Sequence, residues 1–131
     1  MIPQPVRAAL LFAASALMGF AAVVNVTTAV PHLVEDMVEI GMRPTLLAGV
    51  LLALRFGSFA MFGFAGVVLA AAFRASRGGA IERLPLAIVA LTYVAFGIAS
   101  FVWSRSPHTL GYVFMGVLVA LAVARGDEKA A

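Results

Sequence analysis

Long apolar runs, separated by short polar segments, limit the folds open to this chain more than any other feature. A helix needs about 20 apolar residues to cross the hydrocarbon core of a bilayer, and the runs cover residues 8–30, 46–73, 84–103 and 109–124. Hydrophobic residues make up 63% of the chain, more than a soluble domain of this length can bury. The sequence therefore predicts an all-α integral membrane protein: a single domain, residues 1–131, folded as a bundle of four transmembrane helices.

The first run allows a second interpretation. Arg7 precedes it, Thr27, Thr28 and Ala29 follow its apolar part, and this order also fits a cleaved signal peptide. Cleavage would leave three spans. We favour a retained helix, which keeps the number of spans at four.

Residues 31–44, between the first two runs, are too polar for hydrocarbon because they include three acidic side chains. Apolar residues nevertheless recur there at helical spacing, at Leu33, Met37 and Ile40. One polar and one apolar face are typical of helices that lie in the membrane interface. We expect a short amphipathic helix at the outer surface between the first and second spans.

Lysine and arginine resist translocation across a membrane, so their distribution sets the orientation of the spans. With four spans, most of these residues fall on one side of the membrane: Arg7, Arg74, Arg77, Arg83, Arg125 and Lys129. Arg43 and Arg105 fall on the other side, and Arg55 lies inside a span. We therefore expect a multi-pass protein of the inner (cell) membrane with both termini in the cytoplasm.

Charge and cysteine content exclude several functions. The formal net charge is +3, but the basic residues are scattered at helix ends and form no stripe with interleaved aromatic residues, so we expect no nucleic acid partner. The chain has no cysteine, which excludes disulfides and thiolate metal sites. The lipid bilayer is the first partner that the composition predicts.

Arg55 interrupts the second run, and a charge at the centre of a bilayer costs about 2.5–3.5 kcal/mol on insertion scales. Counted from an inner boundary near Phe73, Arg55 lies at the outer interface, where it can pair with an acidic group of the outer segment. Counted from an outer boundary at Leu46, it lies deep and lines an outward-facing polar cavity with Ser58, to which Tyr93 adds a hydroxyl. We favour the shallow position. The deep one makes Arg55, Ser58 and Tyr93 candidate ligand-binding residues.

One imidazole and three carboxylates form a stripe along the outer segment. They are spaced so that they share one face of a helix, and they are His32, Glu35, Asp36 and Glu39. His108, on the same side of the membrane by the topology above, can add a second imidazole, and such a set suits zinc, iron or manganese. The alternative, which we favour, is a solvated helix face in which Glu39 pairs with Arg43. We accordingly expect no resident cofactor, with a divalent metal as the alternative.

Small residues repeat at intervals of four along two spans, at Ser15 and Gly19 in the first and at Gly49, Ala53 and Gly57 in the second. Such ridges let helices approach closely in lipid. Arg55 points about 200° away from Gly57 around the helix axis. The second span should therefore contact protein on two sides, either within the chain or across an oligomer or a partner subunit.

No catalytic or nucleotide-binding motif occurs in the sequence. We therefore predict a small, non-enzymatic polytopic membrane protein that acts as an interaction or accessory subunit or associates with itself. One alternative is a small transporter, channel or ligand-binding bundle built around Arg55. The other is a metal site at the outer face.

Overall fold

The computed structural model describes residues 2–124, and these fold into helices without any strand. The elements in chain order are α1 (Gln4–Val24), the π-helical turn η1 (Asn25–Ala29), α2 (Val30–Glu39), α3 (Pro44–Ser76), α4 (Arg83–Ser104), the 3-10 turn η2 (Pro107–Thr109) and α5 (Leu110–Val123). The all-α prediction is confirmed for this part of the chain.

Within residues 2–124, three helices are long and apolar enough to cross a membrane: Gln4–Glu39, Pro44–Ser76 and Arg83–Ser104. A fourth apolar helix, Pro107–Val123, is shorter. This is the helix content of a multi-pass membrane protein, whereas the number of crossings and their orientation stay predictions. The polar tail with Arg125, Asp127, Glu128 and Lys129 lies outside the described residues.

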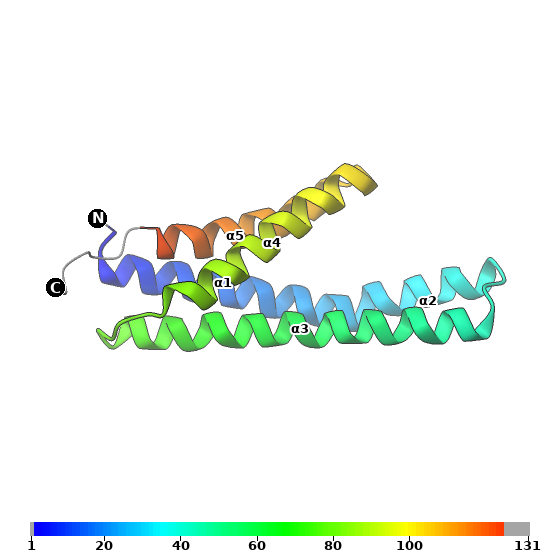
Figure 1. Ribbon diagram of the computed structural model, residues 1–131, viewed down its shortest axis with the longest axis horizontal. Helices are drawn as coiled ribbons and strands as arrows, with labels where there is room; N and C mark the ends of the chain where they lie inside the picture. The colour runs from blue at the N-terminus through cyan, green and yellow to red at the C-terminus, as the bar shows by residue number, and fades with distance from the viewer. Residues whose placement is uncertain (1, 125–131) are drawn as a thin grey trace.

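The helices form two antiparallel hairpins that diverge from one end (Figure 1). The first hairpin consists of α1, η1 and α2 packed along α3, and the second, shorter hairpin consists of α4 and α5. Helix α5 also packs against α1, whereas α3 and α4 touch over only a short stretch. The loop end of the second hairpin, where α4 ends and α5 begins, therefore lies apart from α2 and from the start of α3.

Residues 31–39 are helical, as expected, but they extend the first helix instead of forming a separate element. Pro31 cannot donate a backbone hydrogen bond, and its ring would strike the carbonyl of residue 27 in a regular α-helix. The π turn Asn25–Ala29 ends two residues before Pro31 and replaces the regular α-helical hydrogen bonding there, and the Thr27 hydroxyl donates to the carbonyl of Val23 at 2.9 Å. The result is one helix of 36 residues, Gln4–Glu39, which runs along α3.

The turn that joins this helix to α3 depends on Gly41. Its φ of 73° is a left-handed conformation that favours glycine, and the amide of Met42 donates to the carbonyl of Met37 at 3.0 Å. Pro44 then begins α3, where its missing donor costs nothing. The chain thus reverses sharply, so that α2 and the first residues of α3 form the far end of the first hairpin.

The core lies where all four long helical segments meet. Its largest fully buried side chains are Leu11, Met18, Val68, Leu86 and Val119, contributed by α1, α3, α4 and α5. The Ser15 hydroxyl donates to the Ala65 carbonyl at 3.0 Å inside this core and ties α1 to α3. Beyond the core, the first hairpin continues as an arm, by which we mean α2 together with residues 44–54.

Helices α4 and α5 pack more closely than any side chain would allow at two glycines. A Cβ atom at Gly97 would lie 2.7 Å from the backbone nitrogen of Val113, and one at Gly116 would lie 2.7 Å from the carbonyl oxygen of Ala90. Small residues permit such approach between helix backbones. The ridge predicted on the second span differs, because a Cβ at Gly49 or Gly57 would meet nothing within 4 Å.

Candidate binding cleft between the two hairpins

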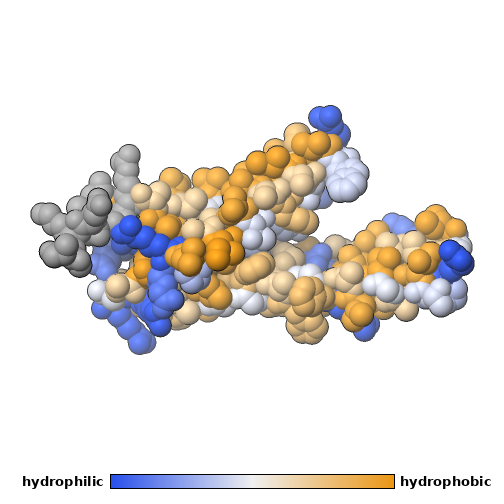
Figure 2. All heavy atoms as spheres, in the orientation of Figure 1, coloured by the Kyte–Doolittle hydropathy of each residue, from blue (hydrophilic) through white to orange (hydrophobic). Residues whose placement is uncertain are grey.

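A cleft of about 360 Å³ lies where the two hairpins diverge, and Figure 2 shows the molecule hollowed there between largely apolar walls. Both hairpins line it. The first contributes Asn25, Ala53, Leu54, Gly57, Ala60, Met61 and Phe64, and the second contributes Thr92, Tyr93, Phe96 and Tyr112. None of these side chains is charged. Pockets of this volume are typical of small-molecule sites.

The cleft is open because the α3 wall is made of small residues. Ala53, Gly57 and Ala60 lie one turn apart on the face of α3 that lines the cleft, and they are too short to reach α4. The opposite wall carries rings from α4 and α5, in which Phe96 packs edge-on against Tyr112 at a centroid distance of 5.1 Å. Two residues of the predicted small-residue ridge, Ala53 and Gly57, thus line a cleft rather than a helix contact.

Tyr93 of α4 forms the most deeply buried part of the lining, with 4% of its surface exposed. Its ring packs edge-on against Phe64 at 6.1 Å and lies 6.2 Å from the ring of Tyr112. Its hydroxyl is buried and has no hydrogen-bond partner within the described residues. Leaving such a group unpaired costs about 1–3 kcal/mol.

The other buried hydroxyls of the described residues are paired. Besides Ser15, Thr109 donates to the Ser106 carbonyl at 2.7 Å. Ser58 donates to the Leu54 carbonyl at 2.9 Å and accepts a hydrogen bond of 2.8 Å from the Asn25 side-chain amide. The Tyr93 hydroxyl is therefore an exception in a structure that otherwise satisfies its buried hydroxyls.

The structure brings Ser58 and Tyr93 to the cleft region but leaves Arg55 outside. Arg55 is exposed and forms no ion pair in the part of the chain that the structure describes, and Phe56 and Phe59 beside it are 75% and 76% exposed. Because Gly57 faces the cleft, a side chain about 200° around the helix must point away from it. The polar groups of the cleft come from uncharged residues instead.

The residues proposed for a metal are not gathered around one point. His32 Nδ1 lies 3.4 Å from Glu35 Oε2, with both side chains largely exposed, and Asp36 and Glu39 lie on the same helix. His108 Nδ1 instead lies 2.7 Å from the Ser106 hydroxyl, in the turn before α5, which stands apart from α2 in Figure 1. Residues 2–124 hold no group of three or more histidine or acidic side chains arranged for a metal ion. The metal site stays a prediction.

Asn25, Phe64, Phe96 and Tyr112 were not among the predicted site residues. A partial signal exists, since Tyr93 and Phe96 share one face of the third span at helical spacing. Nothing in the sequence shows, however, that the two hairpins diverge at that level. The cleft therefore depends on helix packing that a local pattern does not encode.

Comparison with protein-family models, with characterised proteins and with solved structures finds no match to this chain. The class that fold and site define is an all-helical protein with the long apolar helices of a multi-pass membrane protein. An uncharged cleft lies between its two helical hairpins where they diverge. Function has to be inferred from that geometry.

Proposed function

We propose that this protein is a membrane-embedded binding protein for a small, uncharged, lipophilic molecule that carries a hydrogen-bond acceptor. The observation that carries the proposal is the Tyr93 hydroxyl, buried and unpaired beside a cleft whose described lining is uncharged and mostly apolar. A carbonyl or ether oxygen of a ligand would supply its missing partner once the surrounding side chains move aside, because the hydroxyl oxygen is itself fully buried. An ionised ligand is disfavoured because none of the described side chains that line the cleft carries a charge to offset its desolvation.

The aromatic lining further limits which ligands fit the cleft. Phe64, Phe96 and the two tyrosines offer ring faces and edges to a planar molecule, and such pairs contribute about 0.5–1.5 kcal/mol beyond area burial. The Thr92 hydroxyl lines the same cleft but donates to the Ile88 carbonyl at 2.8 Å. A ring system with one acceptor oxygen is the ligand chemistry that these groups fit best.

The length of α4 supports a cleft in the outer half of the membrane. Its 22 residues span about 33 Å, close to the thickness of a hydrocarbon core. The same length counted back along α3 from Ser76 ends at Arg55. We infer four crossings, with the loop at residues 77–82 in the cytoplasm. Arg55 then lies at the outer interface, and the arm extends beyond it.

Photolabelling with benzophenone, an uncharged aromatic ketone, tests the proposal. We expect labelled peptides of the purified protein to map to Met61, Phe64 and Tyr93, and Gly57→Leu to abolish that labelling by filling the cleft. Gly63→Leu is the matched control, because Gly63 lies on the same helix with open space around it and does not line the cleft. Equal labelling of the wild type and Gly57→Leu would show that the probe binds elsewhere.

Self-association is a second candidate function, and the arm favours it. Ile40, in the turn between the two helices of the arm, is 78% exposed, and Leu52 of the arm is 72% exposed. If the arm leaves the bilayer, these side chains need a protein cover, and a second copy of the chain is the simplest one.

The absence of cysteine makes self-association directly testable. We expect Leu52→Cys to form a disulfide-linked dimer in oxidised membranes if the arms of two copies meet. Because the chain has no cysteine of its own, any disulfide must join the introduced residues. Leu91→Cys on α4, 69% exposed at lipid level, serves as the control for random collision. Equal dimer yields from the two variants would count against an interface at the arm.

A further inference from the structure

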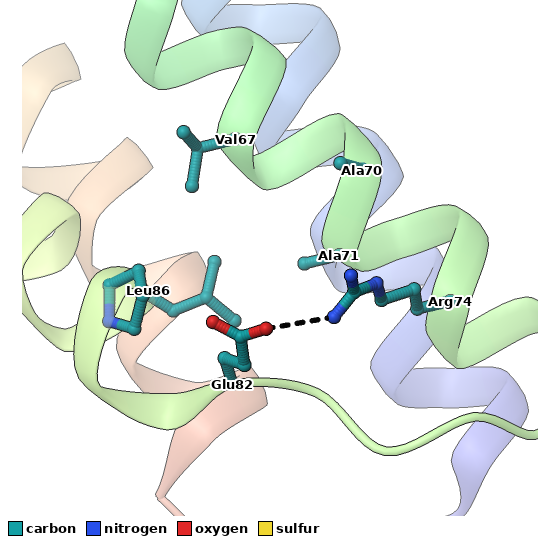
Figure 3. Close-up of a pocket in the computed structure, with 7 residues that line it drawn as sticks. Val67, Ala70, Ala71, Arg74, Glu82 and Leu86 are labelled. Atoms are coloured by element: carbon teal, nitrogen blue, oxygen red, sulfur yellow. Dashed lines mark hydrogen bonds and ion pairs between the residues drawn. The ribbon is translucent and has the colours of Figure 1, made fainter.

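A second opening, of about 280 Å³, lies at the other end of the α3–α4 interface. Figure 3 shows Val67 and Ala71 of α3 facing Leu86 at the start of α4 across it. At one end the Arg74 guanidinium donates to the Glu82 carboxylate, with Nη1 and Oε1 3.0 Å apart. The groove is thus apolar along its walls and ionic at one end.

Arginines gather at this end of the molecule. Arg7 lies near the start of α1, Arg74 and Arg77 at the end of α3, and Arg83 at the start of α4, and the hairpins bring these helix ends together (Figure 1). Glu82 is the one acidic residue that the described chain has there, since the others lie on α2. An apolar groove therefore opens beside an excess of positive charge.

We propose that this groove binds an anionic phospholipid, with one acyl chain between α3 and α4 and the phosphate at Arg74. Guanidinium groups donate charge-assisted hydrogen bonds to phosphate, and basic pockets between transmembrane helices bind anionic headgroups in this way. Arg74 and Arg77 outnumber Glu82 beside the groove and favour a headgroup with net negative charge over a zwitterionic one. This site is separate from the cleft beside Tyr93 and does not depend on its function.

Glu82 competes with the phosphate for Arg74, so removing its charge should change lipid retention in a direction that depends on the headgroup. Its side chain is 71% exposed, so the carboxylate can turn into water when a phosphate takes its place. Glu82→Gln should then raise the retention of an anionic lipid by removing the competitor. If a zwitterionic lipid used Glu82 to hold its ammonium group, the same change would lower retention and overturn the proposal.

Native mass spectrometry of the full-length protein, released from nanodiscs of equal phosphatidylglycerol and phosphatidylcholine, measures that retention. We expect phosphatidylglycerol to be retained in preference, and Arg74→Gln to lower its retention about fivefold. Arg55→Gln makes the same change in charge at an exposed position far along α3 and should leave retention unchanged. Equal retention of the two lipids, or equal losses in the two variants, would overturn the proposal.

The acyl-chain part of the proposal has its own control. Ala71→Leu narrows the groove without changing any charge and should lower phosphatidylglycerol retention, whereas Gly66→Leu, in open space on the same helix and outside the groove, should not. An unchanged Ala71→Leu variant would overturn the seating of the chain in the groove. Stabilisation by inorganic phosphate equal to that by phosphatidylglycerol would show a free-anion site instead.

Discussion

Helix α4 packs closely against α5 but touches α3 over only a short stretch. Against α5, glycines at positions 97 and 116 bring backbones so close that an added Cβ would meet Val113 or Ala90. Against α3, contact is confined to a short stretch that includes the rings of Phe64 and Tyr93, and openings of about 360 and 280 Å³ flank it. The first contact brings two backbones together at its glycines, although an opening of about 330 Å³ lies beside it, whereas the second is short and leaves open space on both sides.

This difference shows that a small residue does not by itself predict a helix contact. Gly116 and Gly57 are both helical glycines in apolar spans, yet one is packed against a neighbouring backbone and the other lines a cleft. What separates them is the residue opposite, since Gly116 faces a main-chain carbonyl, whereas Gly57 shares its cleft with aromatic rings. The α4–α5 contact should therefore tolerate substitution far less than the α3 wall.

The largest expected effect tests the tight contact. Gly116→Ala places a Cβ 2.7 Å from the carbonyl oxygen of Ala90, which cannot move without shifting α4, and we expect a loss of about 2–3 kcal/mol in the free energy of unfolding. Thermal unfolding of the detergent-solubilised protein, followed by circular dichroism, measures this loss as a lower Tm.

Gly111→Ala is the matched control for that variant. Gly111 lies on the same helix and an added Cβ would meet nothing within 4 Å, so the stability should stay within about 0.5 kcal/mol of the wild type or rise slightly through better helix propensity. If both variants unfolded at the same temperature, the contrast between the two faces of α4 would be wrong.

Helix positions could be predicted well wherever polar residues, glycine or proline punctuate the apolar runs. The predicted spans 46–73, 84–103 and 109–124 differ from α3, α4 and α5 by a few residues at each end. The first helix is the exception, because the sequence predicts a boundary at Pro31. A local π turn lets the helix continue through it, and that irregularity has no sequence signature of its own.

The site was predicted less well, and the reason is geometric. Polarity predicts Ser58 and Tyr93, of which Tyr93 lines the cleft and Ser58 lies behind its lining residue Asn25, whereas charge predicts Arg55, which points away. Its direction follows from the helix period once Gly57 is known to face the cleft. That knowledge depends on how two hairpins tilt against each other, which arises from contacts between residues distant in sequence.

The smallest expected effect tests the open contact through the sign of a stability change. Tyr93→Phe removes a buried hydroxyl that no described group pairs with, so the ligand-free protein should gain about 1 kcal/mol, whereas deleting a paired hydroxyl would cost a similar amount. Tyr112→Phe, on the partly exposed ring that shares the cleft, should change the stability little. With benzophenone added the order should reverse, because only the wild type can donate a hydrogen bond from position 93 to the ketone. A Tyr93→Phe variant less stable than the wild type without ligand would mean that the protein itself satisfies this hydroxyl, and the α3–α4 contact would then be structural along its whole length.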